Sequence, residues 1–244
     1  MTDAKLTDAM SPASGQAGFA SFDFAELSPR ERYKLLIGTV VPRPIALVTT
    51  VDAGGRVNAA PFSFFNCLSA DPAILALGVE YRGDGRHKDT GRNIRDRQAF
   101  TVNIVSNAMA EAMNICAVPF EPGTDELTEA GFTTVAGVKI ASPRIGEAPV
   151  AFECRHHVTL SIGASRDIIL GEVVHAHLRS DIVDPEKLYV DPAALDAIGR
   201  MGGHGYASTR DYFDLKTMTV DAWRREGDAA NRREPRNGRE RWDR

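Results

Sequence analysis

Residues 87–94 include residue types that can hold a phosphate group. Asp89 or Thr90 can cap the start of a short helix, which leaves free N–H groups at the positive end of the helix dipole. Lys88 adds a full positive charge at that end, and the Thr90 hydroxyl adds a donor. The segment therefore predicts a pocket for a phosphate monoester, although an ordinary capped surface helix with solvated charges has the same composition.

A second candidate site lies in two apolar stretches, residues 43–50 and 58–66, joined by a Gly-rich turn at 52–55. This pattern predicts two strands of a hairpin. Pro61 falls inside the second stretch, and because proline donates no ladder hydrogen bond we expect it on an edge strand or at a bulge. Backbone groups beside such a break can face a cavity, as a flat ring with polar edges such as a flavin requires. An ordinary edge strand is the alternative.

The third candidate is a glycine-rich loop with polar and aromatic neighbours. Three of the four residues 202–205 are glycines, Gly203 among them, so the backbone can pass close to a flat ligand. Tyr206 can stack on such a ligand, Arg200 can bind an anionic group, and His204 is a candidate acid or nicotinamide contact. The spacing is not the G-x-G-x-x-G of dinucleotide sites, and a loop that turns back on the fold is the alternative.

Two histidines raise the question of a metal. His175 and His177 lie on the same face of a predicted strand, a spacing found in some metal sites. His157 on the preceding strand is the nearest further ligand, and no clear carboxylate or cysteine partner emerges. We therefore expect hydrogen-bonded histidines and no metal, with His156 a satisfied core residue. G-x-S-x-G, H-E-x-x-H and Walker motifs are missing from the sequence, which disfavours hydrolases.

Composition narrows the class of protein further. A formal net charge of -4 over 244 residues indicates no general attraction for nucleic acid or anionic membranes. Cys67, Cys116 and Cys154 are too scattered for a disulfide framework, so we expect small buried residues in a reducing compartment. No apolar run approaches the ~18 residues of a membrane helix, and residues 1–18 show no secretory signal pattern. The expectation is a cytoplasmic protein.

Several strands and a few helices must position these candidate residues. Further strands are predicted at 73–79, 99–105, 150–162 and 168–178, and helices at 28–36, 89–97, 108–117 and 125–130. The 150–162 strand alternates, so we expect Val150 through Ile162 at every second position to face a core. Without βαβ alternation, this predicts a mainly β protein with a closed or partly open antiparallel barrel. Residues 1–20 are expected to be a disordered leader, 21–215 one domain, and 216–244 a charged, disordered tail.

Four motifs occur in an order that resembles a known family. They are Pro42–Thr50, Asn58–Asn66, Lys88–Thr90 with Asn93 and Ile94, and Ile198–Gly203 with Tyr206. Together they resemble the flavin reductase-like family, whose fold is an FMN-binding split β-barrel, an antiparallel Greek-key barrel with a few flanking helices. The resemblance implies that the 60–64 backbone and Asn66 line the flavin ring and that residues of the 88–94 segment hold the phosphate end of FMN. The cofactor-binding residues implied are Arg43, Ala60, Pro61, Phe62, Ser63, Phe64, Asn66, Lys88, Thr90 and Asn93.

The resemblance also implies an activity. NADH or NADPH would give a hydride from nicotinamide C4 directly to flavin N5, so no catalytic side chain is required. Family members are typically homodimers, and a flavin-dependent monooxygenase is a possible recipient of the reduced flavin. An FMN-binding electron carrier that does not use NAD(P)H is the main alternative. A scaffold whose Arg-rich tail binds a partner is a third interpretation.

Overall fold

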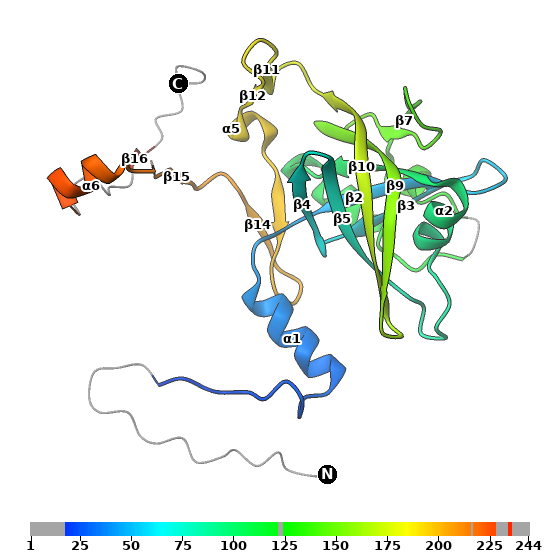
Figure 1. Ribbon diagram of the computed structural model, residues 1–244. Coiled ribbons are helices and arrows are strands. Elements are labelled where there is room, and N and C mark those ends of the chain that lie inside the picture. The colour runs from blue at the N-terminus through cyan, green and yellow to red at the C-terminus, as the bar shows by residue number, and fades with distance from the viewer. Residues whose placement is uncertain (1–17, 122–123, 216, 228–233, 236–244) are drawn as a thin grey trace.

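A seven-stranded antiparallel sheet forms the centre of a computed structural model that describes residues 18–121, 124–215, 217–227 and 234–235 (Figure 1). Its strands are β2 (Ala46–Val51), β3 (Val57–Phe62), β4 (Phe65–Ala70), β5 (Ala73–Glu80), β6 (Ala99–Ile104), β9 (Val150–Ile162) and β10 (Arg166–Leu178). They pair in the order β3-β2-β6-β9-β10-β5-β4. The predicted mainly β class and antiparallel pairing are confirmed.

The sheet curls because its two end strands, β3 and β4, follow one another in the chain. Residues 58–66, predicted as one strand, are in fact divided at Ser63 and Phe64, since β3 pairs with β2 whereas β4 pairs with β5. Pro61 of β3 lies opposite Leu47 of β2. Because β3 is an edge strand, the N–H that Pro61 lacks leaves the hydrogen-bond ladder intact. The interruption therefore comes two residues after the proline.

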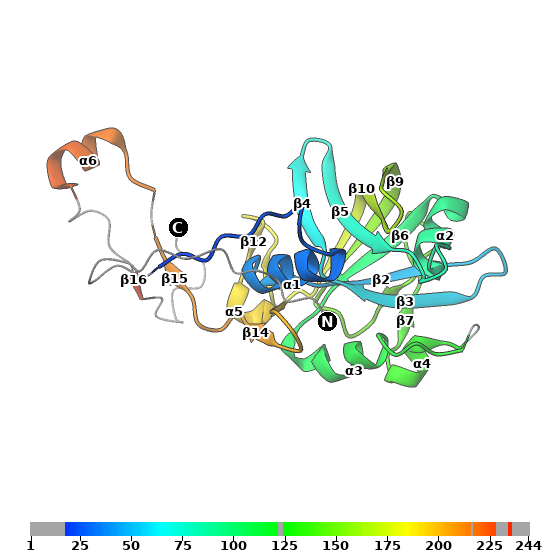
Figure 2. The ribbon, with the colours of Figure 1, turned by 90° about the horizontal axis from the view of Figure 1, so that it is seen from below.

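The helices are α1 (Pro29–Thr39), α2 (Asp89–Arg97), the 3-10 turn η1 (Asn107–Met109), α3 (Ala110–Ile115), α4 (Glu126–Ala130), α5 (Pro192–Leu195) and α6 (Val220–Glu226). Figure 2 shows α2, α3 and α4 beside the barrel strands and α6 apart from them. The predicted 89–97 helix is confirmed with the same bounds. The predicted 108–117 helix is shorter, because a 3-10 turn replaces its first residues.

Short strands complete the fold: β1 (Arg43–Pro44), β7 (Thr134–Val135), β8 (Arg144–Ile145), β11 (Val183–Asp184), β12 (Tyr189–Val190), β13 (Ile198–Arg200), β14 (Tyr206–Ser208), β15 (Phe213–Asp214) and β16 (Glu234–Pro235). β1, β13 and β14 form a small sheet beside α1 (Figure 1). The predicted leader lies mostly outside the described residues, as does much of the predicted tail. Within the tail, α6 forms where no regular structure was predicted, and Thr219 caps its start.

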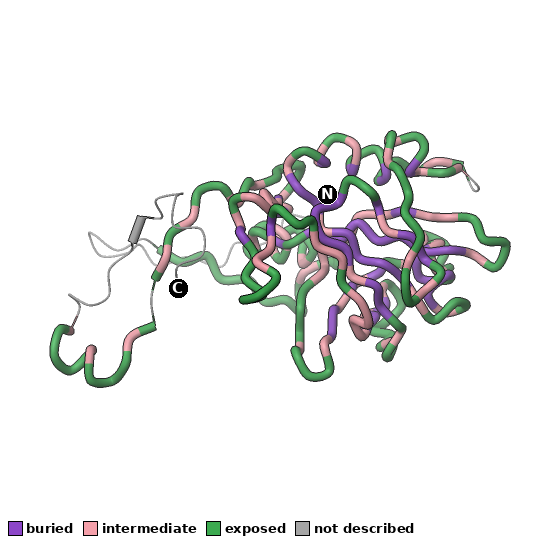
Figure 3. The backbone as a smooth tube through the Cα atoms, turned by 90° about the horizontal axis from the view of Figure 1, so that it is seen from above, coloured by how far each residue is buried: buried purple, intermediate pink, exposed green. Residues whose placement is uncertain are grey.

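The core consists of two apolar clusters on opposite sides of β2. Ala46 and Val48 join the cluster inside the barrel, and Leu47 joins the cluster beneath α3 and α4. All six residues of β2 are therefore buried, as expected for a strand covered on both faces. Figure 3 shows this burial concentrated in the barrel strands, whereas α1 and α6 are largely exposed.

The prediction that one face of β9 is buried along its whole length is wrong for the outer half. Val158, Leu160 and Ile162 are 36%, 49% and 55% exposed. A register shift at Leu170/Gly171 bends the β9–β10 pair, and no core element packs beyond it in the described part of the chain. His156 is half-buried, with ring nitrogens 2.9 Å from Gln98 Oε1 and 2.8 Å from Thr159 Oγ1.

No helix among the described residues is long and apolar enough to cross a membrane.

Candidate functional site

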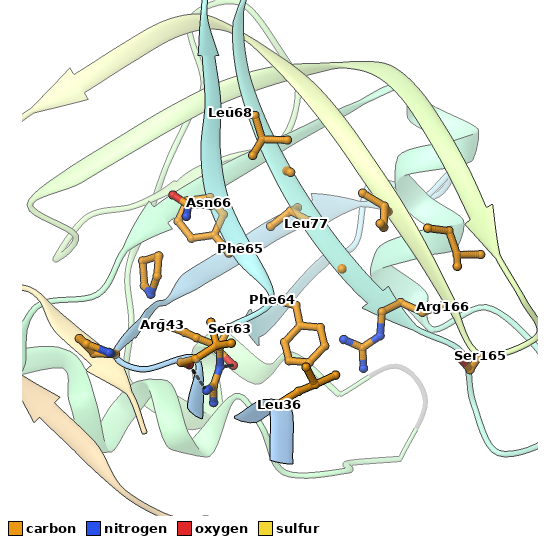
Figure 4. Close-up of a pocket in the computed structure, with 17 residues that line it drawn as sticks. Leu36, Arg43, Ser63, Phe64, Phe65, Asn66, Leu68, Leu77, Ser165 and Arg166 are labelled. Atoms are coloured by element: carbon orange, nitrogen blue, oxygen red, sulfur yellow. Dashed lines mark hydrogen bonds between the residues drawn. The ribbon is translucent and has the colours of Figure 1, made fainter. Parts of the chain in front are cut away.

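A cavity of about 670 Å³ lies between α1, β1, the β4–β5 pair and the start of β10 (Figure 4). Its wall is mostly apolar, with Leu36, Leu68, Leu77, Ile162 and Ile168 among the lining residues. The polar lining residues are Arg43, Ser63, Asn66, Ser165 and Arg166. Small-molecule sites have about this volume and this mixture of an apolar wall with a few polar groups. Four predicted cofactor-binding residues meet here: Arg43, Ser63, Phe64 and Asn66.

Arg43 connects separate segments of the cavity wall through hydrogen bonds, which is a structural role. Its Nη1 donates to the carbonyls of Ile37 (2.7 Å) and Val40 (2.8 Å), and its Nη2 to that of Met201 (3.1 Å). Its Nε lies 3.4 Å from Ser63 Oγ. The side chain is only 7% exposed, and burial lowers the pKa of its guanidinium. Arg43 therefore joins α1 and the glycine-rich loop to the barrel, and its donors are directed at the protein itself.

Arg166 is a cavity residue that the sequence motifs missed. Its Cζ lies 4.0 Å from the centroid of the Phe64 ring, and its Nη2 donates to Glu80 Oε1 at 2.7 Å. Gly78 makes this arrangement possible, because a Cβ there would fall 2.8 Å from Phe64 Cβ. The β5–β10 register places Arg166 opposite Glu80. Only that register reveals the pair, since the two residues are distant in sequence and belong to no common motif.

The remaining ring-binding candidates lie on the edge strand rather than in the cavity wall. Ala60, Pro61 and Phe62 are partly exposed on β3 and are outside the cavity lining. Glu126 Oε2 accepts the N–H of Ala59 at 3.2 Å, and burial raises the pKa of this carboxyl. The edge of β3 leads from this bond towards Ser63, where the cavity begins.

The predicted phosphate-binding residues separate into an exposed lysine and two buried side chains. Lys88, not Asp89 or Thr90, is the N-cap of α2, because it holds the extended backbone conformation; its own side chain makes no capping hydrogen bond. Its Nζ lies 3.4 Å from Glu80 Oε2. Thr90 accepts a hydrogen bond from Asn58 at 3.1 Å, and Asn93 donates one to Thr50 at 3.0 Å.

The buried pair therefore anchors α2 to the barrel, since Thr90 and Asn93 are each only 2% exposed. The Asp89 carboxylate is turned to Arg82 (2.8 Å) and Arg92 (2.5 Å), so two cations balance its charge. Glu80 lies between Lys88 and Arg166, and this links the helix start to the cavity rim.

The third group of predicted residues forms the β13–β14 hairpin outside the cavity. Arg200 Cζ lies 4.4 Å from the Tyr206 ring centroid, and Arg200 Nη2 donates to the Gly203 carbonyl at 2.8 Å. Gly203 has a φ of +58°, a conformation that favours glycine. His204 is exposed. The hairpin adjoins the cavity wall through β1, which pairs with β13.

The paired histidines belong to a carboxylate network. His177 Nε2 lies 2.7 Å from Glu153 Oε1, and the His175 and His177 ring centroids are 4.7 Å apart. Burial of Glu153 opposes its ionisation, but hydrogen bonds from His177 and three backbone N–H groups lower its pKa to about 2. The described residues contain no group of three His, Cys, Asp or Glu side chains that could hold a metal ion.

Comparison with known proteins assigns the fold to a family. The model of the flavin reductase like domain matches residues 37–198, which include α2 and every cavity-lining residue except Leu36. The chain belongs to the flavin reductase-like family. Its members include flavin-handling oxidoreductases, and this chain is accordingly an oxidoreductase of that kind.

Solved structures agree with this assignment. Nitrilotriacetate monooxygenase component B from Bacillus cereus is 30% identical, with a TM-score of 0.78 over 82% of this chain and 100% of that one. Pseudomonas fluorescens 2-nitrobenzoate 2-nitroreductase NbaA is 35% identical, with a TM-score of 0.76 over 82% and 98%. A Shewanella frigidimarina protein with a split barrel domain is 18% identical, with a TM-score of 0.70 over 80% and 96%. The predicted split barrel is thereby confirmed.

Proposed function

We propose that the protein binds FMN and is an NAD(P)H-dependent flavin reductase. The observation that carries this proposal is the family match over residues 37–198, which includes every cavity-lining residue except Leu36 and also the start of α2. The cavity suits a flat, largely apolar ring in volume and lining. A bound flavin would supply an N5 atom that takes a hydride from C4 of the nicotinamide.

In this proposal the cavity residues bind and orient the ring. Leu36, Phe64 and Leu77 exclude water from one side, and Asn66 offers an amide Nδ2 without a hydrogen-bond partner among the described residues. The Ser63 hydroxyl is held in place by Arg43. The exposed edge at Ala60–Phe62 offers backbone groups along one side of the site.

The phosphate end of the cofactor is proposed to lie at the start of α2. Lys88 would exchange its 3.4 Å contact with Glu80 for the phosphate, and the N–H groups of the first turn would donate to it. Thr90 and Asn93 act as positioning residues that hold α2 against the barrel. Arg200 and Tyr206 on the adjacent hairpin would guide the nicotinamide substrate.

A second copy of the chain is proposed to cover the cavity. Leu68, Leu160 and Ile162 are 60%, 49% and 55% exposed, and Leu68 and Ile162 also line the cavity. Exposed apolar side chains grouped in this way favour a homodimer. We further propose a cytoplasmic location, since the reaction uses the intracellular nicotinamide pool, and a flavin-dependent monooxygenase as recipient of the reduced flavin.

The spectrum of the purified protein, before and after anaerobic NADH or NADPH, tests the proposal. A yellow protein that bleaches within seconds supports the reductase. One that stays oxidised favours the electron carrier, in which FMN exchanges electrons with another protein. A colourless protein is assayed with added FMN, where turnover supports flavin as a diffusing substrate. Absence of both binding and turnover refutes the proposal.

A further inference from the structure

Arg166 is a cavity-lining cation with most of its hydrogen-bonding capacity unused. A guanidinium carries five N–H donors, and Glu80 accepts from one of its nitrogens, Nη2, at 2.7 Å. Nε and Nη1 have no hydrogen-bond partner among the described residues. The side chain is 19% exposed, so these donors face a sheltered space. Arg43, by contrast, directs its three nitrogens at protein oxygens.

The guanidinium of Arg166 is held in a defined orientation. Phe64 supports one face, with a Cζ-to-centroid distance of 4.0 Å, and Glu80 lies opposite across the β5–β10 pair. Gly78 leaves the space in which Phe64 and Arg166 meet. A guanidinium held in this orientation loses little side-chain conformational entropy when it binds an anion.

The free donors of this guanidinium and the wall beside it favour a monoanion. Arg166 pairs with Glu80 at 2.7 Å through Nη2, and its Nε and Nη1 keep their donors for a second acceptor. Leu77, Ile162 and Ile168 form the neighbouring wall of the cavity. In apolar surroundings a charge-assisted hydrogen bond is stronger than in water. Nε and Nη1 of Arg166 can therefore bind a carboxylate beside this wall.

We infer that the Arg166 end of the cavity is a subsite for the carboxylate of a small aromatic acid. A single guanidinium, partly neutralised by Glu80, matches a monoanion better than a phosphate dianion. The branched aliphatic wall matches the apolar body of an aromatic ring. In Figure 4, Phe64 lies between this end and the Ser63 end. The inference rests on the proposed function only in assigning the flavin ring to that other end.

Calorimetric titration with benzoate, and with benzamide as its neutral isostere, tests the inference on FMN-treated protein. We expect benzoate to bind at least tenfold more tightly than benzamide, because only the carboxylate pairs with the guanidinium. Arg166→Met should abolish this preference, and Arg166→Lys should retain part of it. Glu80→Gln should strengthen benzoate binding severalfold, since a competing carboxylate is removed.

Arg155→Met is the matched control, because Arg155 is exposed on β9 and is outside the cavity lining. The Arg155→Met variant should prefer benzoate to benzamide as strongly as the unaltered protein does. Thermal melts show that each variant is folded. The opposite directions expected for Glu80→Gln and Arg166→Met separate anion recognition from general loss of structure.

Three results would overturn the inference: no benzoate binding, equal affinity for benzoate and benzamide, or an unchanged preference in Arg166→Met. Displacement of benzoate by equimolar inorganic phosphate would show a phosphate site instead. FMN affinity is measured separately by fluorescence. Benzoate selectivity without FMN binding would refute the proposed function and leave the subsite inference intact. FMN binding without benzoate selectivity would refute the subsite inference and leave the proposed function intact.

Discussion

Replacing Arg43 by methionine tests whether this residue links α1 to the barrel or binds the cofactor. The change removes three donor bonds of 2.7, 2.8 and 3.1 Å to the carbonyls of Ile37, Val40 and Met201. Hydrogen bonds to a charged group contribute about 1.5–3 kcal/mol each, but bonds from one guanidinium are not additive. Removing the buried cation also removes its desolvation penalty. We therefore expect a net loss of about 3 kcal/mol in the local stability of α1.

Hydrogen exchange measures this loss directly. A loss of about 3 kcal/mol corresponds to roughly a hundredfold faster exchange of the α1 amides, while the amides of β2 and β6 stay protected. Arg200→Met is the control, because Arg200 makes one hydrogen bond to the carbonyl of its own turn. Amide exchange rates in α1 that stay within threefold of those in the unaltered protein would refute this linking role of Arg43. Lost FMN binding with α1 fully protected would instead support a direct cofactor contact.

Three further predictions concern single residues. Lys88→Ala should weaken FMN binding by about 1.5–3 kcal/mol in a flavin titration, with Arg86→Ala, whose partner is Asp84, as control; unchanged affinity removes Lys88 from the site. Glu153, whose folded pKa is about 2 against 4.5 ordinarily, contributes stability that is present above pH 4.5 and lost towards pH 2; Glu153→Gln should flatten unfolding free energy over that window, and an unchanged slope would contradict this. Gly78→Ala should lower thermal stability by about 1–3 kcal/mol, since its Cβ meets Phe64; an unchanged melting temperature would count against this packing.

Local patterns in the sequence determined much of the fold. Residues 150–162 and 89–97 have the bounds predicted from alternation and from helix-start residues. The start of α1 is likewise local, since Ser28 and Glu31, three residues apart, form a capping box there. Strand alternation and helix caps depend on residues a few positions apart, so a sequence alone contains them. The order of the four motifs was also sufficient for the family.

The tertiary structure decided which predicted residues share a site. Arg43 meets Met201 across 158 positions, and the β5–β10 register brings Arg166 to Glu80. Thr90 and Asn93 turned inward because Asn58 and Thr50 supply their partners.

The outer half of β9 shows the same limit, since its alternation predicts a buried face whether or not anything packs against it. Short-range periodicity reports which side of an element is apolar. What covers that side, and which distant side chain completes a charge pair, depend on strand register and chain closure.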